Sequence, residues 1–230
     1  DAWRSGCFGP GAARDLEAAK AAAERLGIEH RVVPLAEEFQ RMVLDYFRGE
    51  YLAGRTPNPC VRCNQRMKFG LLPEAARAQG AAFDRFATGH YVRADRDVAT
   101  GRWRLLRGRD RVKDQSYFLF ELNQAQLSRA MFPLGALGKE EVRRIARGYD
   151  LPIADKPDSQ EICFIPDGDY AAFVEQHGEV APPGPGRIVD LEGHVLGSHD
   201  GIHRYTVGQR RGLGIAHSSP LYVLELRPED

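Results

Sequence analysis

Apolar side chains recur at helical spacing in three stretches of the first half of the chain. Ala12 to Leu26 is rich in alanine, keeps its leucines on one face and stops before Gly27, a residue type that often ends helices. Glu37 to Leu52 repeats large apolar residues at the same spacing, and Leu71 to Gln79 stops before Gly80. The pattern therefore predicts three helices.

Two shorter apolar stretches, Ile28 to Leu35 and Phe83 to Thr88, predict strands beside these helices. Alternation of strands and helices is typical of an α/β fold with a doubly wound parallel sheet, whose ligands bind beyond the carboxyl ends of the strands. Gly89 and His90 follow such an end. A glycine there lets a ligand approach the main chain, and the imidazole either faces that ligand or is an ordinary surface histidine.

The second half of the chain changes character. Asp97 to Leu106 predicts a hairpin, Lys139 to Tyr149 a basic amphipathic helix, and Asp169 to Gln176 a short helix. The proline- and glycine-rich break at 182–186 separates two predicted domains, residues 1–181 and 187–230. The second domain is expected to be small and β-rich, with short strands at Arg187–Asp190, Val195–Ser198, Arg204–Val207 and Leu221–Leu226.

Charge changes this picture only locally, because 32 basic side chains balance 32 acidic ones in 230 residues. One run is strongly basic: Arg102, Arg104, Arg107, Arg109, Arg111 and Lys113. Such a run suits a nucleic-acid phosphate backbone or a solvated charged hairpin, and composition alone leaves both open. No stretch reaches the roughly 18 apolar residues of a membrane span, and no signal peptide is expected. With four cysteines and one Cys-x-x-Cys pair, the cytoplasm is the expected compartment.

Three of the four cysteines stand in polar segments flanked by turn-forming residues. Two lie in Thr56-Pro-Asn-Pro-Cys-Val-Arg-Cys-Asn64 and one in Asp158-Ser-Gln-Glu-Ile-Cys-Phe-Ile165. A packing cysteine is usually surrounded by apolar residues, so Cys60, Cys63 and Cys163 are predicted to serve sulfur chemistry. A structural zinc site is the alternative, although a second pair of ligands at metal spacing is missing.

Two further motifs carry groups suited to phosphates and bases. Lys113-Asp-Gln-Ser-Tyr-Phe-Leu119 offers an ammonium and an amide, although Asp114 could equally cap the segment that follows it. Tyr205-Thr-Val-Gly-Gln-Arg-Arg-Gly-Leu-Gly214 joins two arginines to glycines that permit close approach, and a merely basic turn is the alternative.

Together with Ala87-Thr-Gly-His-Tyr91, these segments resemble the tRNA-specific 2-thiouridylases, the MnmA/TrmU family, in which they occur in the same order. The resemblance implies a Rossmann-like adenine nucleotide alpha hydrolase (PP-loop ATPase) domain followed by a small β-rich central domain. It implies adenylation of the C2 oxygen of the wobble uridine in tRNA by ATP with Mg²⁺, followed by sulfur transfer to C2. A sulfur-relay protein or cysteine desulfurase would supply the sulfur.

The resemblance also assigns roles to individual residues. Cys163 matches the cysteine that carries a persulfide, and Cys63 matches the one that completes the transfer and can end in a disulfide with Cys163. Gly89 matches an ATP contact. The matches to contacts with the tRNA or its target base are Asn58, Pro59, Cys60, His90, Lys113, Asp114 and Gln115. The target base would be splayed out of the anticodon loop into the site.

Two departures from the family pattern matter. The phosphate-binding signature Ser-Gly-Gly-x-Asp-Ser-Ser is missing, so the chain is expected to be a fragment without the amino-terminal pyrophosphatase loop and the carboxyl-terminal β-barrel, and inactive alone. Cys60 stands where many relatives carry an aspartate, and a thiol with a pKa of about 8.5 replaces poorly a carboxyl of about 3.9. Cys60, Cys63 and Cys163 could instead hold an iron-sulfur cluster that delivers hydrosulfide.

Two functions of other classes stay open. An amide-forming ligase of the same nucleotide-hydrolase fold would also adenylate its substrate but would need no group of three cysteines. A non-catalytic RNA-binding or redox module would use the cysteines as a zinc site or a dithiol switch.

Overall fold

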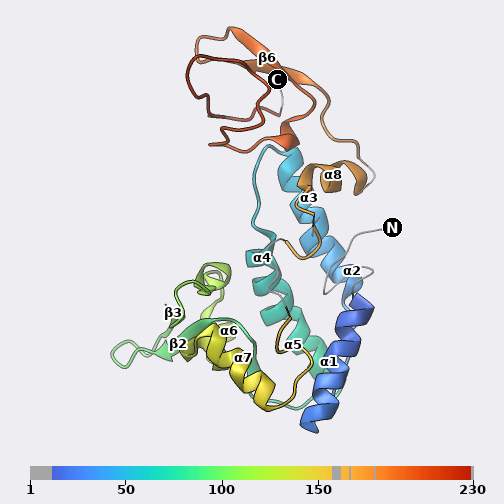
Figure 1. Cartoon of the computed structure of the whole chain (residues 1–230), viewed down its shortest axis with the longest axis vertical. Coiled ribbons are helices and arrows are strands. Elements are labelled where there is room, and N and C mark those ends of the chain that lie inside the picture. Colours follow the sequence, from blue (N-terminus) through green and yellow to red (C-terminus); the bar gives the residue numbers. More distant parts are fainter. Residues whose placement is uncertain (1–11, 157–161, 166, 179, 229–230) are drawn as a thin grey trace. The chain divides into compact units, whose positions relative to one another are not determined.

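The computed structural model describes residues 12–156, 162–165, 167–178 and 180–228 (Figure 1). They form two compact units. The first unit holds the described residues up to Met42 and those from Cys60 to Ile165, and the second holds Val43–Pro59 with the described residues from Asp167 onward. These units divide the chain differently from the predicted domains 1–181 and 187–230, which stay a prediction. No helix among the described residues is long and apolar enough to span a bilayer.

The predicted helices of the first half are confirmed. α1 (Ala12–Leu26) ends before Gly27, whose φ of 66° is a left-handed conformation that glycine adopts without strain. The predicted helix from Glu37 to Leu52 is one helical run of three segments, namely α2 (Ala36–Phe39), the π-helix η1 (Gln40–Leu44) and α3 (Asp45–Leu52). The boundary between the two units falls within η1.

The third helix is longer than predicted, because it begins inside the first cysteine motif. It consists of α4 (Pro59–Arg62), the nine-residue π-helix η2 (Cys63–Leu71) and α5 (Leu72–Ala78). A π-helix hydrogen-bonds each residue to the fifth one along, so residues five apart come one above the other. Cys63 and Lys68 have this spacing.

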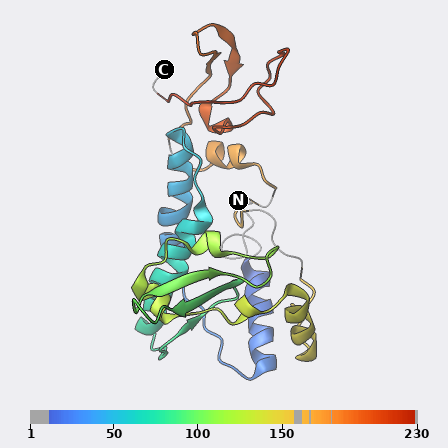
Figure 2. The ribbon, with the colours of Figure 1, turned by 90° about the vertical axis from the view of Figure 1, so that its left-hand side faces the viewer.

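The strands of the first unit are short. β1 (Phe86–Ala87) pairs in parallel with β4 (Ala130–Met131), and β2 (Val92–Arg96) pairs antiparallel with β3 (Trp103–Arg107) in the predicted hairpin (Figure 2). The prediction of a strand at Ile28–Leu35 is wrong for this structure. A strand exists only through hydrogen bonds to a neighbour, and no described segment pairs with these residues.

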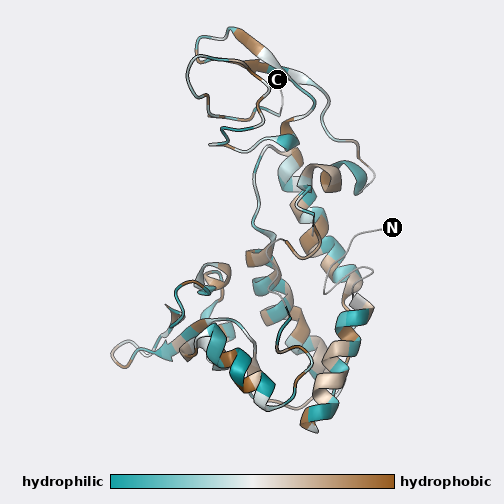
Figure 3. Cartoon of the chain, viewed as in Figure 1, coloured by the Kyte–Doolittle hydropathy of each residue, from teal (hydrophilic) through white to brown (hydrophobic). Residues whose placement is uncertain are grey.

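Packing around the β2–β3 hairpin forms the core of the first unit. The buried members are Phe69, Val92, Leu119, Leu122, Leu127 and Ala130. Trp103 and Leu105 pack on them from β3, and Phe86 does so from β1. Helices α6 (Gln124–Arg129) and α7 (Lys139–Gly148) and the 3₁₀ segments η3 (Ser116–Leu119) and η4 (Pro133–Ala136) complete the unit. Along α7, hydrophilic and hydrophobic stretches alternate (Figure 3), which confirms the predicted amphipathic helix.

The second unit is built on aromatic packing. The Phe47 ring of α3 lies 5.6 Å from the Phe173 ring of α8 (Tyr170–Gln176), and Tyr51 stacks on Tyr170 at 4.8 Å. β5 (Gly186–Val189) and β6 (Val195–His199) form an antiparallel pair, and η5 (Ile202–Arg204) follows. The strands predicted at Arg204–Val207 and Leu221–Leu226 are not formed, because only Val223 makes ladder-like bonds there, with Gly208 and Gln209.

Candidate functional site

The first cysteine motif lies on the helical run that starts with α4. Cys60 and Cys63 are half-buried, one turn apart. Between them, the Arg62 guanidinium donates a hydrogen bond from Nε to the main-chain oxygen of Met42 in η1, over 2.7 Å. This bond ties the two cysteines to the helical run that begins with α2.

The second cysteine motif docks on the same helical run. Cys163 is half-buried, and the next residue, Phe164, is 1% exposed, with its ring edge-on to the Phe39 ring of α2 at 6.2 Å. Phe39 and Met42 are three residues apart, so the fold anchors both cysteine segments on neighbouring positions of one helix. Residues 157–161 of the second motif lie outside the described part of the chain.

The segment after β1 packs against the helical run that carries the first cysteine motif. His90 accepts or donates a hydrogen bond at Nδ1 with the Thr88 hydroxyl over 2.8 Å, and its ring lies 6.0 Å from that of Phe69 in η2. Burial, and then the charge of Lys68, lower the pKa of His90 to about 4. The imidazole is therefore neutral near pH 7, and a proton on Nε2 could be donated to a ligand when Thr88 donates to Nδ1.

Lys68 also acts on the first cysteine. Burial raises the pKa of the Cys60 thiol, and the Lys68 ammonium offsets part of that rise. One cation thus lies within electrostatic reach of both Cys60 and His90. In the sequence, Lys68 stands out only as one of the basic residues that follow the first cysteine motif, with Arg62 and Arg66. Its effect on Cys60 and His90 depends on the fold.

The cysteines are not prearranged around one metal ion. A tetrahedral zinc site has sulfur bonds of about 2.3 Å, which bring its ligands close to one another. Among the described residues, three potential ligand atoms come within 4.8 Å of each other only at Asp190, Glu192 and His194, in the exposed β5–β6 turn. This geometry argues against structural zinc on the three cysteines but does not bear on the larger iron-sulfur cluster.

Asp114 and Gln115 hold the main chain of the first unit. Asp114 accepts hydrogen bonds from the Gly108 amide at 2.7 Å and the Ser116 hydroxyl at 2.8 Å. The Gln115 side chain accepts from the Tyr91 amide at 2.9 Å, and the Gln115 amide donates back to the Tyr91 oxygen. Asp114 therefore ties the main chain of this loop, but it is not the N-cap of η3, which is Gln115 and makes no side-chain capping bond. The bonds of Gln115 join the segment of Lys113 to that of His90. Lys113 itself is half-buried.

Asn58 and Pro59 lie in the second unit, whereas the other predicted site residues lie in the first. Asn58 is half-buried and Pro59 is buried. Within the second unit, the Thr56 and Thr206 hydroxyls hydrogen-bond at 3.1 Å, which links the first cysteine motif to the motif at 205–214.

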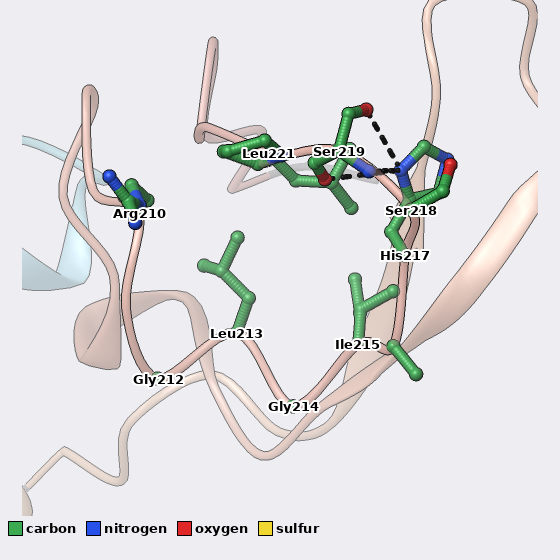
Figure 4. Close-up of a pocket in the computed structure, with 11 residues that line it drawn as sticks. Arg210, Gly212, Leu213, Gly214, Ile215, His217, Ser218, Ser219 and Leu221 are labelled. Carbon is green, nitrogen blue, oxygen red and sulfur yellow. Dashed lines mark hydrogen bonds between the residues drawn. The ribbon is translucent and has the colours of Figure 1, made fainter.

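The glycine-rich motif of the second unit opens into a hollow of about 700 Å³ (Figure 4). One continuous loop lines it from Arg210 to Leu221, with Leu213 and Ile215 on its floor. His217 closes one side through hydrogen bonds between its Nδ1 and Ser219. The hollow is open and mixed in polarity, so the predicted phosphate contact of Arg210 stays a prediction.

The basic hairpin is partly neutralised. The Arg104 guanidinium pairs with Asp95 at 2.8 Å and with Asp97 at 2.9 Å, and Arg109 approaches Glu141 at 4.0 Å. Arg111 is exposed. Carboxylates therefore offset the charge of two members of the run, while Arg102 and Arg107 are exposed as Arg111 is.

Comparison with known proteins identifies the family of the chain. A family model described as "tRNA methyl transferase HUP domain" matches residues 4–167, and one described as "tRNA methyl transferase PRC-barrel domain" matches residues 171–230. These two models confirm the predicted fold class, a HUP-type nucleotide-binding domain followed by a small β-rich domain.

Curated relatives named "tRNA-specific 2-thiouridylase MnmA" match nearly all of the chain. The one from Geotalea uraniireducens is 57% identical over 211 residues, which is 91% of this chain and 55% of the relative. The one from Geobacter metallireducens is 55% identical over 218 residues, 94% of this chain and 57% of the relative. The chain thus spans little more than half the length of these relatives. Because one family model covers most of the chain and these relatives are more than half identical to it, the chain belongs to the MnmA family of tRNA-specific 2-thiouridylases.

Proposed function

We propose that the chain carries the sulfur-transfer part of an ATP-dependent thiolation of C2 of the wobble uridine in tRNA. The observation that carries the proposal is the anchoring of both cysteine motifs on one helical run, through the Arg62 bond to Met42 and the Phe164 contact with Phe39. Each of these two segments, a hundred residues apart in the chain, carries a half-buried thiol.

A thiol pair suits this transfer because a thiolate both attacks and leaves well. ATP would convert the C2 oxygen into an adenylate, with release of pyrophosphate. The outer sulfur of a Cys163 persulfide would attack C2 and displace AMP. The Cys63 thiolate would then attack the Cys163 sulfur, leaving the thiocarbonyl on the uridine and a disulfide between Cys63 and Cys163. Two thiols are oxidised and the transferred sulfur is reduced, so the electrons balance.

The segment after β1 supports a nucleotide or base contact. Gly89 is exposed, its φ is not left-handed, and an added Cβ would meet only Leu134 Cδ1 at an ordinary 3.7 Å. The fold therefore does not require glycine at this position, and the exposed main chain there would let ATP approach closely. Neutral His90 beside it would donate a hydrogen bond to a base or ribose oxygen, whereas cations such as Lys68 would pair with the phosphates.

The iron-sulfur route uses the same side chains with one addition. Cys60, Cys63 and Cys163 would hold the cluster, and all three belong to the first unit. Cluster binding needs three thiolates, and the raised pKa of Cys60 opposes that ionisation unless the metal drives it. Iron and acid-labile sulfide analysis after anaerobic purification separates the routes: iron and sulfide near stoichiometry support the cluster, whereas a persulfide on Cys163 without metal supports the two-cysteine route. A cysteine desulfurase or sulfur-relay protein would load Cys163.

A chimera tests the activity. In the Geotalea uraniireducens relative, the matching 211 residues are replaced by those of this chain, so that the relative supplies the remainder. We expect 2-thiouridine in the tRNA of cells that depend on the chimera, measured by mass spectrometry of its nucleosides. Cys63→Ser and Cys163→Ser should each abolish it. A folded chimera that binds tRNA but forms no 2-thiouridine, or that keeps forming it in both serine variants, would contradict the proposal.

A further inference from the structure

Two large aromatic side chains stand exposed beside each other at the end of η3. Tyr117 is 64% exposed and Phe120 is 59% exposed, and their ring centroids are 5.9 Å apart. Exposed apolar side chains that occur singly need no explanation, but a paired aromatic surface is costly to leave in water. Nothing in the sulfur-transfer chemistry above uses these rings.

The residues around this pair hold it rigidly. Leu119, between the two, is 1% exposed and belongs to the core of the first unit. The Asn64 amide donates a hydrogen bond from Nδ2 to the Phe118 oxygen over 3.1 Å, and the Gln65 amide donates from Nε2 to the Glu121 oxygen over 3.1 Å. Asn64 and Gln65 directly follow Cys63, so the aromatic pair is fastened to the helix that presents that cysteine.

Two cations precede the pair in the chain. Exposed Arg111 and half-buried Lys113 stand a few residues before Tyr117. Of the two nearby carboxylates, Asp114 is occupied by the Gly108 amide and the Ser116 hydroxyl, and exposed Glu121 directly follows Phe120. A basic edge beside aromatic faces is the combination that binds unpaired RNA, because the cations contact phosphates while the rings stack on bases.

We propose that Tyr117 and Phe120 form a stacking surface for an unpaired base of the anticodon loop, a neighbour of the base that reacts. The proposal rests on the proposed function, because it assigns this surface to the same RNA substrate. Stacking reads the flat face that every base has, so the contact holds the loop open without selecting its sequence. It would orient the loop relative to Cys63 through the bonds of Asn64 and Gln65.

Binding of an anticodon stem-loop RNA to the 230-residue chain tests the proposal. Tyr117→Ala and Phe120→Ala should each weaken binding about 10-fold, the change expected when a base loses its stacking partner. Tyr117→Trp and Phe120→Trp should keep wild-type affinity. Tyr149→Ala is the matched control, since Tyr149 is 60% exposed in the same unit but lies at the end of α7. A fully paired duplex of the same length should not distinguish the variants.

The salt dependence separates stacking from charge. The alanine variants at Tyr117 and Phe120 should keep the wild-type slope of affinity against salt, whereas Arg111→Ala should reduce it by about one phosphate contact. Wild-type affinity in both aromatic alanine variants would overturn this inference and leave the proposed function intact. Failure of the wild-type chain to bind the stem-loop would count against both, and thiouridine formation by the chimera would then show which one had failed.

Discussion

Gln126 is expected to hold the π-helix that begins at Cys63. Its side chain acts twice. Oε1 accepts a hydrogen bond from the Asn123 amide in the capping box of α6, while Nε2 donates to the Gln65 oxygen at 2.8 Å and to the Phe69 oxygen at 3.2 Å in η2. Gln126→Glu keeps the acceptor for Asn123 and removes both donated bonds, so it perturbs η2 while sparing the cap.

The magnitude follows from those two bonds. Each is worth about 0.5–1.5 kcal/mol net, so their loss should cost about 1–3 kcal/mol. The new carboxylate would also face the Gln65 and Phe69 carbonyl oxygens, which repel it, and this places the expected cost toward the upper end. Because the lost bonds connect α6 to η2, the loss should appear as local opening of η2 rather than as global unfolding. An opening that costs about 2 kcal/mol less is populated about 30-fold more often.

Two measurements on the full chain check this expectation. Hydrogen exchange of the peptide covering 63–71 should accelerate about 30-fold in Gln126→Glu, and iodoacetamide should alkylate Cys63 faster. Asn123→Ala is the matched control, because it removes the side-chain cap of α6, worth about 1 kcal/mol, and leaves the bonds from Gln126 to η2 in place. Near pH 4 the new carboxyl regains a proton to donate, so part of the protection of η2 should return.

The reasoning would be refuted by equal exchange of η2 in Gln126→Glu and Asn123→Ala. In that case, the capping box alone would account for the role of Gln126, and its hydrogen bonds to η2 would not stabilise the π-helix that begins at Cys63.

Three further outcomes are expected. By NMR, His90 should titrate near pH 4. Because burial holds the pKa of the folded state below the unfolded value of about 6.5, the contribution of neutral His90 to folding stability is complete above pH 6.5 and is lost as the pH falls toward 4. A midpoint near 6.5 would contradict this. Asp114→Ala should cost about 1–3 kcal/mol in urea unfolding, because it strands the buried Gly108 amide. Burial raises the pKa of Asp114, but the hydrogen bonds from Gly108 and Ser116 lower it more, so the net pKa is lowered. The contribution of this carboxylate to folding stability is therefore present above about pH 4 and is lost below it. Asp114→Asn should show no such loss of stability in acid. Arg48→Met should lower the melting temperature of the second unit, because it removes the donors to the buried Val174 carbonyl and to the Val180 carbonyl. Arg55→Met, which breaks an exposed pair, should leave that temperature unchanged.

Local chemistry made much of this fold predictable. The helix at Ala12–Leu26 with its glycine terminator and the amphipathic helix at Lys139–Tyr149 follow from periodicity and turn residues, and the structure has them. The hairpin predicted at Asp97–Leu106 exists, but its first strand lies before Asp97, at Val92–Arg96. The strand at Ile28–Leu35 was wrong, because a strand depends on a partner as well as on its own apolar pattern. The strands expected after residue 203 failed for the same reason.

By itself, the sequence determined which residues are chemically able to act. The cysteine motifs, the segment of His90 and the segment of Lys113 stand out by composition, and their order identified the family. Only the tertiary structure decided which of them meet. The two cysteine segments dock on neighbouring positions of one helical run, the charge of Lys68 acts on both Cys60 and His90, and Asp114 is occupied by main-chain amides. These outcomes depend on contacts between segments that are far apart in the chain, and residue spacing carries no record of such contacts.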